Sequence, residues 1–355
     1  MTKLNRGTSI YTGIDVFKLI SSFMVVLLHA IETTNYYAVA VREILTWFAV
    51  PFFFISSGFF LQKGLTKAEN KAEYFKKYVK NLLFLFLVWA VVIYSPIVIH
   101  SYVNTNKTES ALKIALLLFR RIFIIGPGPY WYLVALLCSA IFIYFCHTKT
   151  YEKLLLFVMI LGFLLQIGYV SFREILSEIS VFKFLFDGIY FVYSWEKNFL
   201  MYGIPFMGLG YFFAKKGTKV KPSMAVLMFL ASTLLGIFEY NIPKIFPSEF
   251  WNGNKIFFAF AFQAISIFLL AKSVSFNISK KTSLFIRQLS SFIYFSHYIF
   301  LYYIMNPILR NHTNISTYSP NMILPKTVVT LLVCLLLFVL IKRINNKYLN
   351  LLLNG

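Results

Sequence analysis

Residues 14–29 read IDVFKLISSFMVVLLH and place two ionisable side chains, Lys18 and His29, inside the first apolar stretch of the chain. A helix turns by about 100° per residue, so eleven positions bring both side chains back to within roughly 20° of one face, about 16 Å apart along the axis. Asp15 and Ser22 share that face, because they stand three or four positions from Lys18. Ionisable groups in an apolar helix are costly and usually functional, so we expect this polar stripe to mark the site.

The composition is that of an integral membrane protein. Of the 355 residues, 59% are hydrophobic and 13% are charged, and the mean hydropathy is +0.72. A membrane-spanning helix takes about 20 apolar residues, which predicts an all-α fold with about ten transmembrane helices and short interfacial helices, in one domain over residues 1–355. The ten stretches lie near residues 11–31, 44–62, 81–101, 130–146, 153–172, 199–214, 223–240, 255–272, 288–308 and 324–341.

The basic residues indicate orientation in the membrane. The net charge is +21, but the charges are scattered over short loops, which argues against a nucleic-acid partner. With a cytoplasmic N-terminus, most of the 34 Lys and Arg residues fall in cytoplasmic loops, as the positive-inside rule requires. We therefore expect both termini in the cytoplasm.

Three connecting segments carry further expectations. Residues 64–80 are rich in lysine and are expected to form a short cytoplasmic helix or a solvated loop that meets membrane lipid headgroups or a polyanionic substrate. Residues 111–125 are expected to lie as a helix at the outer interface, since two adjacent arginines would be costly at mid-bilayer. Residues 172–197 are expected to form two surface helices over a pocket, or a segment that is simply interfacial.

His29 is the first candidate for chemistry. Histidine titrates near neutral pH, so His29 can act as a general base on an acceptor hydroxyl or amine, and Glu32, about one turn on, can orient its ring. His297, near the middle of the ninth stretch, is either a packing residue or a second polar group of the site. Ser22 is a weak nucleophile candidate, because seven positions separate it from His29. No zinc spacing, Walker loop or Gly-x-Ser-x-Gly elbow occurs in the sequence, so no metal site, ATPase or hydrolase is predicted.

Four motifs occur together along the chain. They are Lys18 and His29 with ten residues between them, the run VPFFFISSGFFL at 50–61, the run YWYL at 130–133, and a Ser-x-x-x-Tyr-x-x-His pattern at 290–297. In this combination the chain resembles the membrane-bound acyltransferase-3 family over essentially its whole length. The strongest likeness is to members resembling the membrane domain of vancomycin-resistance serine racemases, in which that domain is linked to amino-acid uptake.

The resemblance implies an enzyme that transfers an acyl group, usually acetyl, from cytoplasmic acyl-coenzyme A to an acceptor at the outer face. The acceptor is expected to be an envelope glycan, a lipid-linked sugar or a small amine, and the location a bacterial plasma membrane. The donor is then expected at Asp15, Lys18, Ser22, Lys76, Lys77 and Lys80, and the acceptor near Trp131, Tyr132, Tyr294 and His297. Many members carry arginine at the Lys18 position, and lysine cannot form the planar fork of arginine.

Two other classes stay open. In a transporter for a small polar substrate such as an amino acid, Asp15, Lys18 and His29 would bind the substrate or relay protons. The lack of internal sequence repeats counts mildly against this class. A pseudoenzyme that only recruits partner proteins is the third possibility, and no recognisable soluble module supports it.

Overall fold

A computed structural model of the protein describes residues 11–33, 35–104, 119, 128–193, 197–245, 258–312, 319–344, 346 and 352–353. The regular elements in these ranges are helices. In chain order they are α1 (Thr12–Ala30), α2 (Tyr36–Leu45), α3 (Ala49–Lys67), α4 (Lys71–Asn104), η2 (Gly128–Tyr130), α6 (Trp131–Thr148), α7 (Glu152–Ser171), α8 (Arg173–Leu176), α9 (Ser180–Tyr193), η3 (Phe199–Gly203), α10 (Ile204–Lys215), α11 (Pro222–Ile245), α12 (Phe258–Ser273), α13 (Lys280–Tyr298), η4 (Ile299–Met305), α14 (Asn306–His312), η5 (Pro320–Met322) and α15 (Ile323–Ile344).

Seven helical segments of the described chain are long and apolar enough to cross a membrane. Each of the ten expected stretches coincides with a helix, but α4, the η3–α10 segment and the 16-residue α12 are not among the seven. The all-α membrane fold is therefore confirmed. The number of crossings and the orientation of the termini stay predictions.

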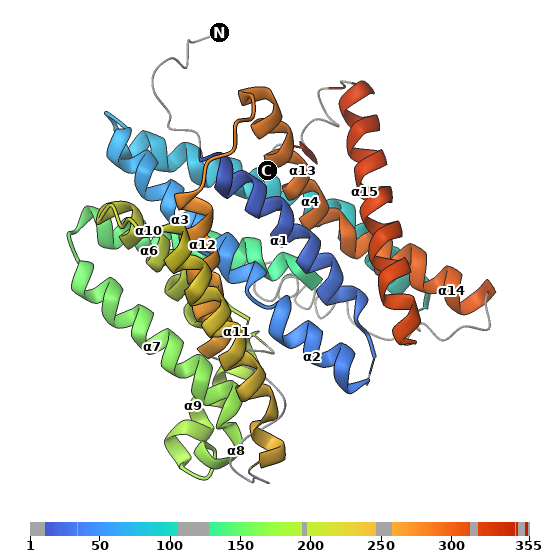
Figure 1. Ribbon diagram of the computed structural model, residues 1–355, viewed down its shortest axis with the longest axis horizontal. Helices are drawn as coiled ribbons and strands as arrows, with labels where there is room; N and C mark the ends of the chain where they lie inside the picture. Colours follow the sequence, from blue (N-terminus) through green and yellow to red (C-terminus); the bar gives the residue numbers. More distant parts are fainter. Residues whose placement is uncertain are drawn as a thin grey trace.

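Apolar side chains cover the outer faces of several helices. Leu164 on α7, Leu234 on α11 and Leu336 on α15 are 59–68% exposed. Figure 1 shows α7 and α11 along one side of the bundle and α15 on the opposite side. A soluble protein rarely exposes contiguous apolar faces of this size, so these helices present a surface suited to lipid.

Helix α1 is the central element of the bundle. It packs against α3, α12, α13 and α15, and Figure 1 shows it running between them. The polar stripe of α1 is consequently shielded by neighbouring helices. This position explains how Asp15 and Ser22, at 1% and 0% exposure, are buried in a membrane protein.

Helices α3 and α10 approach each other closely because glycine lies on both sides of their contact. A Cβ atom on Gly58 of α3 would overlap the carbonyl of Met207, and one on Gly210 of α10 would overlap the carbonyl of Ile55. Small residues at such positions let backbones pack by van der Waals contact, which replaces the hydrophobic effect inside a bilayer. The backbones of α3 and α10 are therefore closely packed.

The structure tests two of the three expectations for the connecting segments. The separate helix and the solvated loop expected as alternatives for residues 64–80 are both wrong, since residues 64–67 end α3 and residues 71–80 are the first turns of α4. Helix α4 begins where the Asn70 side chain accepts a hydrogen bond from the Glu73 amide at 3.0 Å. No glycine or proline stands between Lys80 and Pro96, so the helix continues past Lys80. Helices α8 and α9 confirm two helices within 172–197. The helix expected at 111–125 lies outside the described residues, apart from Phe119.

Candidate functional site

A cavity of about 280 Å³ contains the His29 imidazole, at the C-terminal end of α1. We call it the histidine cavity. Half of its twelve lining residues are tryptophan or tyrosine, and one lysine contributes a cation. The lining includes Trp47, Trp131, Lys197, Tyr202, Tyr294, Tyr298 and Tyr302. A concave, mostly aromatic space with a few convergent polar groups is the usual form of a small-molecule site.

His297 from α13 lies beside His29. The two ring centroids are 5.2 Å apart. His297 is fully buried, and its Nδ1 donates a hydrogen bond to the Ile293 carbonyl at 3.1 Å. Its Nε2 has no hydrogen-bond partner among the described residues, and in the neutral ring this atom carries a lone pair that can accept a proton. The two histidines, 268 positions apart in sequence, therefore form one polar pair.

Two π-helical segments border the histidine cavity. Segment η3 supplies Tyr202, and segment η4 supplies Tyr302 directly after α13. Rings of Tyr298 and Tyr302 lie 6.1 Å and 6.2 Å from the His29 ring. Short π-helical turns are rare and occur often at functional sites, because they redirect side chains within a helix. Their presence on two walls of one cavity supports its assignment as the site.

Glu32 lies two residues after the end of α1, and its carboxylate is held by side chains of other helices. It accepts hydrogen bonds from Asn306 Nδ2 and from Lys326 Nζ, both at 3.1 Å. The Lys326 side chain is fully buried, and that of Glu32 is 18% exposed. These contacts tie the end of α1 to α14 and α15. The predicted role of Glu32 in orienting the His29 ring stays a prediction.

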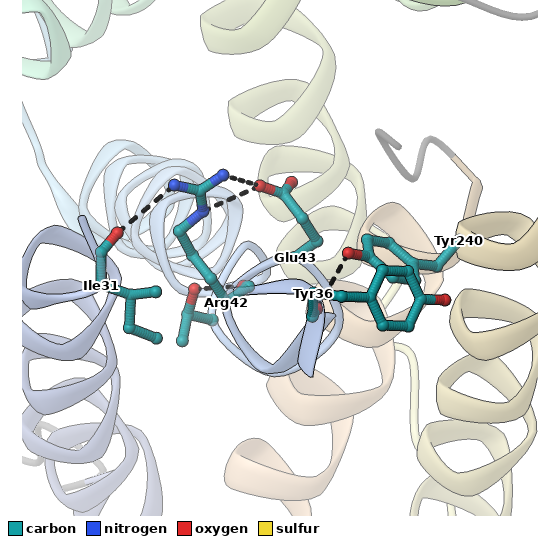
Figure 2. Close-up of polar contacts among 6 residues, drawn as sticks. Ile31, Tyr36, Arg42, Glu43 and Tyr240 are labelled. Atoms are coloured by element: carbon teal, nitrogen blue, oxygen red, sulfur yellow. Dashed lines mark hydrogen bonds and ion pairs between the residues drawn. The ribbon is translucent and has the colours of Figure 1, made fainter. Parts of the chain in front are cut away.

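Arg42 of α2 fixes the same end of α1 from the other side. Its guanidinium pairs with Glu43 at 2.7 Å and donates to the Ile31 carbonyl at 3.4 Å, two residues after His29 (Figure 2). The Tyr36 ring packs 5.1 Å from the ring of Tyr240 on α11. The backbone that carries His29 is therefore anchored to α2 and, through it, to α11.

A second cavity, of about 240 Å³, lies along the N-terminal half of α1. We call it the basic cavity, because Lys18 and Arg287 line it together with Ser57, Tyr78, Asn81 and Tyr132. Lys18 Nζ also lies 5.1 Å from the centroid of the Phe60 ring. Lys76, Lys77 and Lys80 are exposed on the turns of α4 that bring Tyr78 and Asn81 to this cavity. Their roles toward a donor stay predictions.

The side chains of Asp15 and Ser22 form hydrogen bonds within the helix bundle. The Asp15 carboxylate accepts two hydrogen bonds at 3.2 Å from Arg287 and a third from the Ser283 hydroxyl. Ser22 donates to the Leu19 carbonyl of its own helix at 2.8 Å. Neither residue lines the two cavities, so a direct contact with a donor stays a prediction for both.

Tyr294 lines both cavities. Its hydroxyl donates to the Pro129 carbonyl at 3.3 Å, and its ring lies 5.2 Å from those of Phe53 and Tyr132. The structure thus separates the acceptor residues expected from the sequence. Trp131 lies in the histidine cavity, Tyr132 in the basic cavity, and Tyr294 between them.

The comparison with known families decides the assignment. The model of an acyltransferase domain, that of the acyltransferase-3 family, matches residues 11–342. The chain belongs to this family. An amino-acid racemase of Enterococcus faecalis is 26% identical over 253 residues, which cover 68% of this chain and 34% of the relative. A second amino-acid racemase of the same organism is 26% identical over 212 residues, 56% of this chain and 27% of the relative.

The family assignment and the apolar helices support a membrane protein of the acyltransferase-3 family. The chain spans about a third of the length of the curated relatives that it matches. No solved structure matches it. The donor, the acceptor and the residue roles stay proposals.

Sequence reasoning did not find Lys197, Arg287 or Lys326. Lys326 stands within the tenth apolar stretch, so the rule that ionisable residues in a span need a partner could have identified it. Arg287 precedes the ninth stretch by one residue. A basic residue at the end of a span usually indicates only which side of the membrane is cytoplasmic. Lys197 is the last residue of the long connection 172–197, and no local pattern distinguishes it from an interfacial lysine.

Proposed function

We propose that this acyltransferase moves an acyl group from acyl-coenzyme A in the basic cavity to a hydroxyl or amine acceptor in the histidine cavity. One observation carries the proposal: a base and a pair of cations occupy neighbouring cavities that share the Tyr294 wall. The cations suit an anionic donor, and the aromatic walls around His29 suit an acceptor with one apolar face.

His29 serves as the general base. Its imidazole removes the proton from the acceptor hydroxyl while the oxygen attacks the thioester carbonyl carbon. The carbon–sulfur bond of the tetrahedral intermediate then breaks, and the leaving thiolate takes the proton from the imidazolium. His297, 5.2 Å away between ring centroids, keeps the pocket polar and offers a second proton acceptor. The reaction leaves an ester and a free thiol, with the base regenerated.

The acyl group has to pass Tyr294. The hydrogen bond that holds this side chain, at 3.3 Å, is longer than usual for a hydroxyl donor. A rotation of the Tyr294 side chain joins the two cavities, and its return closes them after transfer. An acetyl group is small and uncharged and suits such a passage, so acetyl-coenzyme A is the proposed donor.

The acceptor is proposed to be an envelope glycan or a lipid-linked sugar at a bacterial plasma membrane. Trp47, Trp131 and Tyr202 offer ring faces within one cavity of about 280 Å³. This volume admits about one sugar ring and not a long oligosaccharide, so a terminal or exposed residue of the glycan is acylated.

Transport of a small polar substrate such as an amino acid is the second candidate. Two cavities that share the lining residue Tyr294 also suit alternating access. In that case His29 and Lys18 bind the substrate, and no thioester is consumed.

Purified protein in nanodiscs, incubated with labelled acetyl-coenzyme A and glycan acceptors, separates these candidates. We expect acyl transfer that His29→Ala abolishes and that the control His147→Ala leaves intact, since His147 bonds to Tyr211 at the other end of α6. Flux of labelled amino acids into proteoliposomes without coenzyme A, together with no acyl transfer, contradicts the enzymatic proposal.

A further inference from the structure

Arg287 is fixed in one orientation by Asp15. Its Nε and Nη2 donate to the two carboxylate oxygens, both at 3.2 Å, and the Asp15 side chain is 1% exposed. The Ser283 hydroxyl also donates to this carboxylate. A side-on pair of this kind fixes the plane of the guanidinium as well as its position.

The guanidinium of Arg287 has further N–H donors that can bind a ligand. Arginine carries five N–H donors, and Asp15 accepts from two of them. The Arg287 side chain is 45% exposed and lines the basic cavity. It therefore presents fixed, accessible donors at the edge of a cavity.

The charge balance of this cavity favours an anion. Lys18 and Arg287 supply two positive charges against one carboxylate, that of Asp15. Ser57 and Asn81 add neutral hydrogen-bonding groups on the wall. Lys18 alone offers a point charge, whereas an arginine matches two oxygens of a phosphate at once.

We infer that Arg287 binds a phosphate group of the donor at the mouth of the basic cavity, while the phosphate-free arm extends past Lys18. This inference rests on the proposed function, because the donor is taken to be a coenzyme A thioester. The cavity, at about 240 Å³, is too small for a whole nucleotide thioester. The phosphates therefore stay near the exposed guanidinium, and the narrow arm enters.

Two probes test the inference by direct binding to protein in nanodiscs: acetyl-coenzyme A and acetyl-pantetheine, which lacks phosphate. We expect Arg287→Gln to raise the Kd for acetyl-coenzyme A at least about tenfold and to leave the Kd for acetyl-pantetheine unchanged. Arg287→Lys keeps the charge without the fork and should recover part of the loss. Lys281→Gln, an exposed charge on the same helix, is the matched control and should change neither Kd.

The outcomes separate binding from structure. Equal weakening of both probes, or of neither, overturns the inference, because Arg287 then serves only to join α1 and α13. Ser283→Ala removes another hydrogen bond of that joint and reports its structural contribution. If Arg287→Gln does not fold, the same comparison is made with Arg287→Lys.

Failure of the proposed function gives a different result. If acetyl-coenzyme A binds in an Arg287-dependent way but no acyl group reaches an acceptor, the proposed reaction fails and the phosphate site stands. If Arg287→Gln transfers acyl groups with an unchanged KM for acetyl-coenzyme A, the phosphate site fails and the reaction stands.

Discussion

The ion pair between Glu32 and Lys326 should contribute more to folding than to chemistry. Lys326 Nζ lies 3.1 Å from Glu32 Oε2, and the lysine side chain is fully buried. Glu32→Gln keeps the shape of the side chain but leaves the buried ammonium without its carboxylate. Removal of one partner from a buried pair costs about 3 kcal/mol or more, because the remaining charge has lost its compensation. At about 2–4 °C per kcal/mol, the thermal midpoint falls by roughly 6–12 °C.

Removal of the lysine of this pair should cost less stability than removal of the glutamate. Lys326→Met leaves a Glu32 carboxylate that is partly exposed and still bonded to Asn306, so we expect a loss of about 1 kcal/mol. The double variant Glu32→Gln/Lys326→Met should recover most of the stability of the wild type, since no buried charge remains.

The midpoint of thermal unfolding in detergent, followed by tryptophan fluorescence, is measured for all three variants. The rate of acyl transfer is measured on the same preparations. The reasoning is refuted if Glu32→Gln keeps the midpoint of the wild type and yet loses acyl transfer. That result assigns Glu32 to the orientation of the His29 ring, as the sequence alone suggested.

Three further predictions concern the passage, the helix packing and the polar stripe. Tyr294→Ala should join the two cavities, so that a cysteine-reactive reagent added from one side reaches a cysteine placed at position 29; Tyr294→Phe, which only loses the bond to Pro129, should remain closed. Gly58→Ala should cost about 1–3 kcal/mol in a thermal unfolding assay, because the new methyl group overlaps the Met207 carbonyl. Ser22→Ala should leave the rate of acyl transfer within about twofold, since its hydroxyl bonds to its own helix; a loss of more than a hundredfold identifies it as a nucleophile instead.

The helices were predictable because a membrane-spanning helix requires a continuous apolar stretch of about 20 residues. Each apolar stretch of about 20 residues in the sequence coincides with a helix. The stripe on α1 was also informative: Lys18 and His29 line two cavities that share Tyr294, as two residues on one helix face can. Helical periodicity predicts which side chains of one helix lie on the same face.

The partners of the charged residues were not predictable from one sequence. Asp15 pairs with Arg287 across 272 positions, and Glu32 pairs with Lys326 across 294. Periodicity within a helix carries no information on which other helix packs against it. The π-helical turns were equally hidden, because residues 199–203 have the composition of an ordinary apolar helix.

The thin wall at Tyr294 has an electrical consequence. In the proposed mechanism the two cavities that share Tyr294 open to opposite faces of the membrane, and water in both would make most of the membrane voltage fall across the region of this ring and not across the full thickness of about 30 Å of hydrocarbon. A charged solute that crosses the ring then gains or loses about 2.3 kcal/mol per charge at 100 mV. An acetyl group is neutral and does no electrical work there, so turnover by an acyl-transfer enzyme of this design is insensitive to voltage, whereas net movement of an ion through it is not.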